Sequence, residues 1–492
     1  MKTQVAIWAG KIIGVLSRAL GHGGSTIPGI VARKLDAKFL RHSRSIAKTI
    51  FYITGTNGKT TTANLISHLL QTAGQSVMTN REGSNMVTGL SACLVQSAPL
   101  IGWKKYDVAV LEVDEASLPN AIAECPSDYL LITNFFRDQL DRYGEIDLLI
   151  KKMKDSLKYF AGNFIINADD PFSNRFSNLK KDNIYVGLNA HAYPFDSYLM
   201  TESRYCPNCQ NELSYSSVHY GHLGHYHCTC GFKRPETTFA AEKVFNDKKG
   251  IRLVIDDEEY PTTFKGLYNA YNVLFAIQAC QALDVKPDVL RKGLMTYQNS
   301  KGRMQEFLVN GKVWRLNLVK NPAGGNVTLS EYFEGDETKL LMFCLNDNLA
   351  DGEDISWIWD IDMELANRDE LELFIASGTR AHDAALRMKY TGFPEKKIII
   401  LPDMNEAVLY AKRFESPTYI MATYTCLSPM ISILSKEAEK ENKGDSNLET
   451  STIPLLSRYT QSVWRQGKYY LLKKAMRMEG DFSTSRRNQK PK

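Results

Sequence analysis

The chain has 492 residues, of which 43% are hydrophobic and 23% are charged. This length suits about three domains of the usual size, on the order of 100–200 residues each. Because 60 basic residues stand against 55 acidic ones, the formal net charge of +5 does not by itself demand nucleic acid or an anionic membrane as a partner. The sequence holds no run of about 18 uninterrupted apolar residues, which argues against a membrane-spanning helix.

The first twenty residues, MKTQVAIWAGKIIGVLSRAL, have a basic start, but Lys11 and Arg18 interrupt the apolar residues and no small-residue cleavage site follows. They predict an amphipathic helix and not a secretory signal, within an N-terminal segment of residues 1–45, so we expect the chain to stay in the cytoplasm. Five of the nine cysteines stand alone in apolar surroundings, as buried thiols of a reducing compartment do. They are Cys93, Cys125, Cys280, Cys344 and Cys426.

Residues 51–70, FYITGTNGKTTTANLISHLL, place a tight turn between an apolar run and a run with helical spacing. Strand, turn and helix form the context in which G-K-T indicates a phosphate cradle, with backbone N–H groups at a helix N-terminus facing the phosphates. Lys59 would neutralise those phosphates and Thr60 would bind Mg²⁺. A glycine turn that only joins strand to helix is the alternative. The predicted nucleotide-binding residues here are Gly55, Thr56, Asn57, Gly58, Lys59, Thr60 and Thr61.

The stretch TGTNGKTTT resembles the ATP site of the Mur ligases and of their folylpolyglutamate synthase relatives, and later stretches follow in that family's order. The resemblance implies an α/β fold. It places a Mur ligase-like central P-loop ATPase domain at residues 46–300 and a Rossmann-like α/β C-terminal domain at residues 301–438.

Glu112 lies in DVAVLEVDEASL, an apolar run that ends in acids, and it is similar to the magnesium-binding glutamate of that family. Carboxylate oxygens are the hard ligands that magnesium requires, so Thr60 and Glu112 are the predicted Mg²⁺ ligands, with Asp114 and Glu115 as helpers. A charged strand end without a metal is the alternative.

The stretch LLITNFFRDQLDRYG departs from the family. It runs from a second buried strand into three polar residues, Asn134, Asp138 and Asp141. Gln139 stands where amino-acid-adding Mur ligases usually have histidine, and Met153 stands where they have a carbamylated lysine. Lys152 and Lys154 flank that position, and they either carry the modification or form a solvated lysine-rich face.

Three further stretches follow the family's nucleotide-binding segments. Asn167 and Asp169, in FIINADDP, fit the strand and turn near the base. The predicted helix GLYNAYNVLFAIQA has Asn269 and Asn272 in an exposed first turn, where they contact the nucleotide or, alternatively, cap the helix. Arg303, in KGRMQEF, matches the hinge arginine that would reach the nucleotide.

The other four cysteines form C-x-x-C and C-x-C pairs within an insertion at residues 201–235. Paired thiols on two knuckles match a closed, structural zinc ribbon, with Cys206, Cys209, Cys228 and Cys230 as predicted ligands. His227 is the alternative fourth ligand because it restores x-x spacing with Cys230. The insertion has few cations, which disfavours nucleic-acid binding.

After Arg303, strand, loop and helix recur at α/β spacing. In Mur ligases that add an amino acid, one loop of this domain orients that amino acid, and Lys320–Gly324 stands in its place here. An acid-rich loop, LNDNLADGEDISWIWD, contains Asp347, Asp351, Asp354 and Asp360 beside two tryptophans. Together with the cysteine insertion and the stretch EVDEAS, these features are similar to the MurT family, the synthetase subunits of lipid II isoglutaminyl synthase.

The resemblance implies use of ATP and Mg²⁺ to phosphorylate the D-glutamate α-carboxylate in the stem peptide of lipid II. A partner glutaminase of the GatD kind would supply ammonia, which turns the acyl phosphate into D-isoglutamine. Asp354 matches the catalytic residue that completes the partner's Cys-His pair as a triad, and Asp351 is the neighbouring alternative. An autonomous Mur or folylpolyglutamate-type ligase, and a P-loop ATPase that binds nucleic acid, are the competing functions.

Residues 439–492 form a polar linker and a basic tail with interleaved aromatic residues. We expect peripheral contact of this tail with the anionic inner membrane face, because clustered Lys and Arg near such a surface contribute about 1 kcal/mol each. A disordered, solvated tail is the alternative, and nucleic acid is a weaker one.

Overall fold

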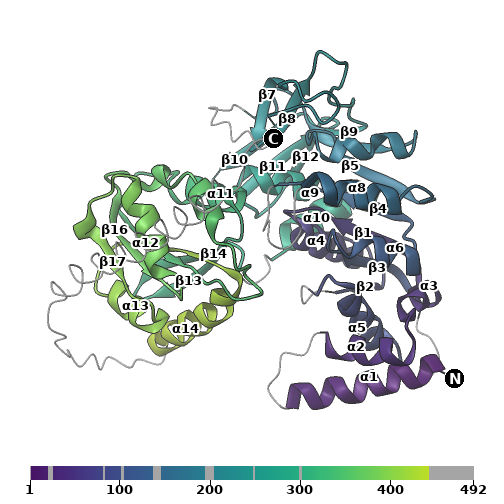
Figure 1. Cartoon of the computed structure of the whole chain (residues 1–492), viewed down its shortest axis with the longest axis horizontal. Helices are drawn as coiled ribbons and strands as arrows, with labels where there is room; N and C mark the ends of the chain where they lie inside the picture. The colour runs from purple at the N-terminus through teal and green to yellow at the C-terminus, as the bar shows by residue number, and fades with distance from the viewer. Residues whose placement is uncertain are drawn as a thin grey trace, which may run out of the picture. The chain divides into compact units, whose positions relative to one another are not determined.

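The structure, a computed structural model, describes residues 2–19, 26–80, 84–100, 105–136, 146–193, 204–247, 250–298 and 302–442 (Figure 1). The chain divides into two compact units. The first comprises Met1–Arg303 with Lys320–Val327, and the second comprises Met304–Val319 with Thr328–Lys492. No helix among the described residues is both long and apolar enough to cross a membrane.

A seven-stranded, fully parallel sheet forms the centre of the first unit. Its strands in spatial order are β2 (Val77–Thr79), β3 (Tyr106–Glu112), β1 (Ala47–Thr54), β4 (Tyr129–Ile132), β5 (Asn163–Asn167), β6 (Ile184–Leu188) and β9 (Phe239–Ala241). The central strand β1 pairs with β3 on one side and β4 on the other. Both of its faces lie against a core, so its apolar run is nearly continuous.

Successive side chains of β1 point to opposite faces of the sheet, and each face has its own core. Phe51 and Ile53 enter one core, while Ile50 and Tyr52 enter the other. Helices α4 (Lys59–Thr72), α9 (Leu267–Gln281) and α10 (Pro287–Thr296) contribute to the first core. The second core receives α1 (Lys2–Ala19), α2 (Ile27–Leu35), η1 (Phe39–His42), α3 (Ser43–Ile46), α5 (Val87–Ser97), α6 (Leu118–Glu124), α8 (Ile146–Ser156) and η2 (Ser173–Leu179).

Two small antiparallel elements lie between β6 and α9 in the sequence. One is the hairpin β7 (Ser214–Tyr220) and β8 (Leu223–His227), and the other is a three-stranded sheet of β10 (Lys243–Asp247), β11 (Gly250–Ile255) and β12 (Glu258–Pro261). Residues of β10 and β11 join the same core as α9, so this stretch is packed onto the first unit.

The second unit contains a six-stranded sheet that is parallel except where β13 pairs with β14. Its strands in spatial order are β13 (Gln305–Val309), β14 (Lys312–Leu318), β18 (Thr418–Ala422), β15 (Lys339–Cys344), β16 (Leu371–Ser377) and β17 (Ile398–Ile400). The connecting helices are α11 (Pro322–Tyr332), η3 (Ser356–Asp360), η4 (Met363–Ala366), α12 (Ala381–Tyr390), η5 (Glu395–Lys397), α13 (Met404–Ala411) and α14 (Tyr424–Asn442). The predicted alternation of strand, loop and helix after Arg303 is therefore confirmed.

Two local predictions are also confirmed. Residues 51–70 form the strand β1, a turn and the helix α4, and Gly74 follows the end of α4 with a positive φ of 83°. The five isolated cysteines are all buried.

Candidate nucleotide-binding site

Two glycines shape the loop that joins β1 to α4. Gly55 and Gly58 have φ values of 121° and 84°, which L side chains rarely adopt. A Cβ atom at Gly55 would lie 2.4 Å from Thr133 Oγ1, and one at Gly58 would lie 2.2 Å from Asn272 Oδ1. The loop thus lies between the end of β4 and the helix α9, and the neighbouring side chains are too close for a residue with a Cβ atom at either glycine.

Lys59 is the first residue of α4, and only 7% of it is exposed. Its ammonium donates to the carbonyl oxygens of Gly55 and Thr56 and lies 3.0 Å from Glu115 Oε1. Burial by itself would lower the pKa of Lys59, but the carboxylates of Glu115, Glu112 and Asp114 outweigh it and raise the pKa above its ordinary value. The amine therefore stays charged at neutral pH, as a phosphate-binding lysine must.

Burial also raises the pKa of Glu115, against the opposing effect of Lys59. Lys320, which belongs to the same compact unit, also opposes this rise in the pKa of Glu115. Glu115 is therefore the buried charge partner of Lys59 in this loop.

Glu112 ends β3 and reaches the first turn of α4. Thr60 Oγ1 donates to Glu112 Oε2 at 2.7 Å, and Asn85 Nδ2 donates to Glu112 Oε1 at 3.1 Å. The backbone N–H and C=O of Glu112 are both hydrogen-bonded to the Asn80 amide, each at 2.9 Å. The structure therefore brings the two predicted magnesium ligands together, with the carboxylate held by Asn85 and the backbone of Glu112 held by Asn80.

Asn57 has the one buried side-chain donor of the loop that lacks a partner among the described residues. Its Nδ2 atom is buried and makes no hydrogen bond, whereas its Oδ1 accepts from Asn321 Nδ2 at 3.1 Å and its N–H donates to Asn134 Oδ1 at 3.0 Å. A buried amide donor without a partner is costly, so it points to an acceptor that is bound there in the working protein. A nucleotide phosphate oxygen fits this donor.

The predicted exposure of the first turn of α9 is wrong. Asn269 and Asn272 are 6% and 4% exposed, because α9 is apolar on nearly all sides and lies inside the core. Asn272 Nδ2 donates to Asn269 Oδ1 at 2.9 Å, and Asn272 Oδ1 accepts from Thr62 Oγ1 at 3.2 Å. The asparagines thus support the phosphate loop from behind.

Arg303 lies in the same charged environment as Glu112. Its pKa is lowered by burial, against the opposing effects of Tyr268 and Glu112. The division between the two compact units falls directly after this residue.

Asn167 and Asp169 are fully buried in the scaffold. Asn167 Nδ2 donates to Thr133 O at 2.8 Å, while Asp169 accepts from Tyr271 at 2.7 Å and from Arg234 at 2.6 Å. They fix the strand ends around the loop. Asp138, Gln139 and Asp141 lie outside the described residues.

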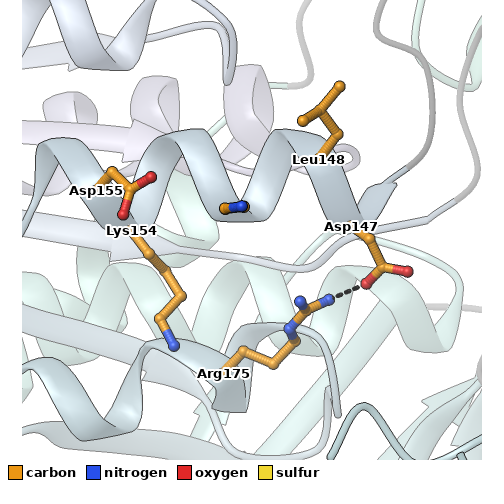
Figure 2. A pocket seen from close by; sticks show the side chains of 6 residues that line it. Asp147, Leu148, Lys154, Asp155 and Arg175 are labelled. Carbon is orange, nitrogen blue, oxygen red and sulfur yellow. Dashed lines mark hydrogen bonds and ion pairs between the residues drawn. The ribbon is translucent and has the colours of Figure 1, made fainter.

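The region predicted to carry a modified lysine is the helix α8 (Figure 2). Met153 is fully buried in the core. Lys154 lines a shallow hollow with Arg175, whose guanidinium pairs with Asp147. The pKa of Lys154 is lowered by burial and by Arg175. Lys152 is exposed.

The four clustered cysteines converge. Their sulfur atoms all lie within 4.8 Å of one another, with Cys206–Cys230 at 3.6 Å and Cys209–Cys228 at 3.4 Å. Tetrahedral zinc with bonds of about 2.3 Å would place its sulfur ligands roughly 3.8 Å apart, so the donor set fits zinc. Within the described ranges, no histidine belongs to this group.

The tip of the hairpin β7–β8 connects the cysteine cluster's insertion to the phosphate loop through Phe136. The Phe136 ring centroid lies 4.5 Å from that of His222 and 5.2 Å from that of Tyr220. Phe136 N donates to Thr56 Oγ1 at 3.1 Å. His222 itself is held by Asp170 at 3.1 Å. The hairpin therefore packs on a residue that hydrogen-bonds the loop.

In the second unit, the two candidate aspartates of the acid-rich loop lie in different environments. Asp351 is buried and accepts from Thr425 N and Thr425 Oγ1, so it anchors the start of α14. Asp354 is half-buried and accepts from Ser356 N at 2.8 Å and Ser356 Oγ at 3.0 Å in a local turn before η3. Of the two, Asp354 is the one that solvent reaches.

Comparison with known proteins follows the same division. Residues 53–226 match the Mur ligase middle domain, and residues 318–427 match the MurT ligase C-terminal model. The chain is 39% identical over 442 residues to the lipid II isoglutaminyl synthase (glutamine-hydrolyzing) subunit MurT of Staphylococcus aureus strain COL, covering 89% of this chain and 99% of that protein. The chain belongs to the MurT family. The MurT subunit of Streptococcus pneumoniae is 33% identical over 434 residues, covering 87% of this chain and 96% of that protein.

Solved structures share the fold. A pseudomurein peptide ligase type C from Methanothermus fervidus has a TM-score of 0.60 at 25% identity and covers 79% of this chain and 78% of its own. MurF from Acinetobacter baumannii has a TM-score of 0.61 at 16% identity and covers 84% of this chain and 81% of its own. The predicted Mur ligase-like α/β fold, with its parallel sheet and C-terminal domain, is confirmed for this MurT family chain.

Gly58→Ala should weaken ATP binding much more than Gly74→Ala. The two glycines have nearly equal positive φ values, 84° and 83°, so their backbone strain is matched. A Cβ at Gly58 meets Asn272, whereas a Cβ at Gly74 meets nothing within 4 Å. Calorimetric titration with Mg-ATP should show a loss of about tenfold or more in affinity for Gly58→Ala only. Equal affinities in the two variants would contradict the close approach to Asn272.

Proposed function

We propose that this chain uses ATP and Mg²⁺ to activate the α-carboxylate of D-glutamate in the lipid II stem peptide for amidation. The observation that carries the proposal is the loop at residues 55–61, where a charged, buried lysine, an unpartnered amide donor and a threonine–glutamate pair meet at a helix N-terminus. The MurT relatives are named for lipid II isoglutaminyl synthase, which supports the choice of substrate.

Each group at the loop has a role in phosphoryl transfer. Lys59 would offset the charge of the β- and γ-phosphates, and backbone N–H groups at the start of α4 would hold them. Thr60 and Glu112 would bind Mg²⁺, which supplies charge neutralisation at the transferred phosphoryl group. Asn57 Nδ2 would donate to a phosphate oxygen. Asn269, Asn272 and Arg303 would complete the nucleotide site, the asparagines through their support of the loop.

The reaction balances in two steps. The γ-phosphoryl group of ATP passes to a carboxylate oxygen of D-glutamate, and ADP leaves. Ammonia then attacks the acyl carbon, phosphate leaves and one proton is released, which gives D-isoglutamine. Phosphorylation is needed because a carboxylate is a poor electrophile and phosphate is a good leaving group.

The ammonia would come from glutamine, hydrolysed by a separate glutaminase subunit of the GatD kind. The relatives are named subunits of a glutamine-hydrolyzing enzyme, which supports this partnership. Asp354 is our choice for the residue that orients the partner's catalytic histidine, since it reaches solvent while Asp351 is committed to α14.

The proposed domains remain residues 1–45, 46–300 with a ribbon at 201–235, 301–438 and 439–492. The predicted membrane contact of the tail after residue 442 lies outside the described residues.

Mass spectrometry of lipid II incubated with the chain, ATP, Mg²⁺ and ammonium chloride tests the reaction. We expect a muropeptide lighter by the difference between a hydroxyl and an amino group.

Lys59→Ala should lower turnover by roughly 10²-fold or more, because the phosphate loses its cation. Its fold should persist, because the helix that begins at this lysine is held by apolar side chains in the core.

Lys48→Ala is the matched control, since this lysine forms an ion pair with Asp107 on the surface, with 66% of its side chain exposed. It should retain full turnover. An unchanged muropeptide despite bound ATP would reject the proposed reaction, and transfer of a free amino acid by this chain alone would favour an autonomous ligase instead.

Asp354→Asn should abolish amidation driven by glutamine and spare amidation driven by free ammonium, because only the ammonia supply depends on the partner. The ratio of the two rates, measured in the complex with the glutaminase, is the readout. Asp351→Ala is the control: it removes two hydrogen bonds from the start of α14, at a cost of about 1–3 kcal/mol in stability, and should leave the ratio unchanged. Equal loss with both nitrogen donors would assign Asp354 another role.

We also propose that Cys206, Cys209, Cys228 and Cys230 hold one structural zinc ion in a ribbon. The cysteines themselves are surrounded by a small apolar cluster that includes Leu213 and Phe232, so metal binding would contribute much of the stability of this end of the insertion. Metal analysis of the purified chain should find one zinc per chain, lost in Cys230→Ser and kept in Cys93→Ser.

Because the hairpin packs on Phe136, the zinc-free variant should bind ATP several-fold more weakly. A zinc-free wild-type chain with full ATP affinity would refute both statements.

A further inference from the structure

The helix α1 presents its large apolar side chains outward and its small ones inward. Val5, Trp8, Ile12, Val15 and Leu16 are between 44% and 61% exposed, and their spacing places them along one side of the helix. The inward side is made mostly of small residues, namely Ala6, Gly10, Gly14 and Ser17, together with Ile7. A helix that only packed on its own unit would show the reverse distribution.

Close packing fixes this orientation. A Cβ at Gly10 would lie 2.9 Å from Pro28 O and from Val95 Cγ1, and one at Gly14 would lie 3.1 Å from Pro28 Cγ. Large side chains therefore cannot turn inward against α2 and α5. Figure 1 shows α1 beyond α2 and α5, at the margin of the first unit.

Polar contacts at one end of the helix also hold it in place. Trp8 Nε1 donates to Leu100 O at 2.7 Å, Gln4 Nε2 donates to the same oxygen at 2.6 Å, and Lys11 Nζ donates to Gln96 O at 3.2 Å. Leu100 is itself 61% exposed, so it extends the apolar face. The face is thus held in position before anything binds to it.

The charge of this region is strongly one-sided. Residues 1–46 contain eight lysines and arginines and a single acidic residue, Asp36, although the whole chain is nearly balanced. Asp36 pairs with His42 at 2.9 Å and with Arg41, while Arg33 and Arg44 pair with Glu124 and Asp128 of the same unit. The cations that bear on a binding surface are therefore those of α1 itself, among them Lys2 and Lys11. Protein–protein interfaces are depleted in lysine, whereas helices that lie on anionic membranes combine an apolar side, tryptophan and flanking cations.

We propose that α1 lies flat on an anionic phospholipid surface, with Trp8, Ile12 and Leu16 at the boundary between headgroups and acyl chains and Lys2 and Lys11 near the lipid phosphates. This inference deepens the proposed function and rests on it, because a lipid-linked substrate is presented at such a surface. The helix does not span the bilayer, in keeping with its length and its cations. It would keep the first unit beside the headgroup region, where the stem peptide of the substrate projects.

Quenching of tryptophan fluorescence by brominated lipid tests the contact directly. The full chain is mixed with vesicles of phosphatidylglycerol and brominated phosphatidylcholine. We expect quenching that Trp8→Phe removes in part, because phenylalanine keeps the apolar surface but takes away the reporter. Trp359→Phe, which changes a 47% exposed tryptophan of the second unit, should leave the quenching unchanged. Equal quenching in the wild type and Trp8→Phe would overturn the proposal.

A second measurement uses the double variant Ile12→Glu/Leu16→Glu, with Leu409→Glu as a control of similar exposure on α13. The double variant should bind the vesicles roughly tenfold more weakly, and should amidate lipid II in vesicles more slowly while keeping its rate on a water-soluble, short-chain substrate. Unchanged vesicle binding would overturn the proposal. If the double variant bound vesicles normally but no longer bound the glutaminase subunit, the face would be assigned to a protein partner instead. A wild-type chain inactive on both substrates would defeat the proposed reaction, and the quenching result would still decide the membrane contact.

Discussion

The close approach of Gly58 to Asn272 is the constraint on which the nucleotide site depends. It requires a left-handed residue without a side chain directly before α4, and it requires α9 to lie directly behind the loop. Asn272 also bonds Thr62 in the first turn of α4, so a single amide fixes both the turn and the helix that follows it. The N-terminus of α4 is thereby aimed at one position, and Lys59, Thr60 and Glu112 take their places around it.

Local sequence patterns predicted the parts of this site that belong to single elements. The apolar run of β1, the glycine turn and the spacing of the apolar residues in α4 each follow from short-range rules of backbone and burial. Glu112 could also be predicted, because it stands where an apolar run ends in acids and is similar to the magnesium-binding glutamate of the Mur ligases. The four cysteines were found by their spacing alone.

Other features depend on contacts between distant segments and gave weaker signals. Asn80, Asn85 and Asn321 orient Glu112 and Asn57 across many residues of chain, and an isolated asparagine carries no pattern that would identify it. The burial of Asn269 and Asn272 did have a signal, because α9 is apolar on nearly all sides and such helices lie inside a core. Phe136 was missed because its importance arises only where the hairpin β7–β8 packs on it.

The internal partners of Lys59 bear on product release. The ammonium of Lys59 donates to two loop carbonyls and pairs with Glu115, so groups of the chain itself can balance its charge. A departing nucleotide therefore exchanges one set of counter-charges for another and does not leave a bare cation behind. Such an exchange keeps the free energies of the filled and empty states close together, which is what an enzyme that must discharge a spent nucleotide in every cycle requires.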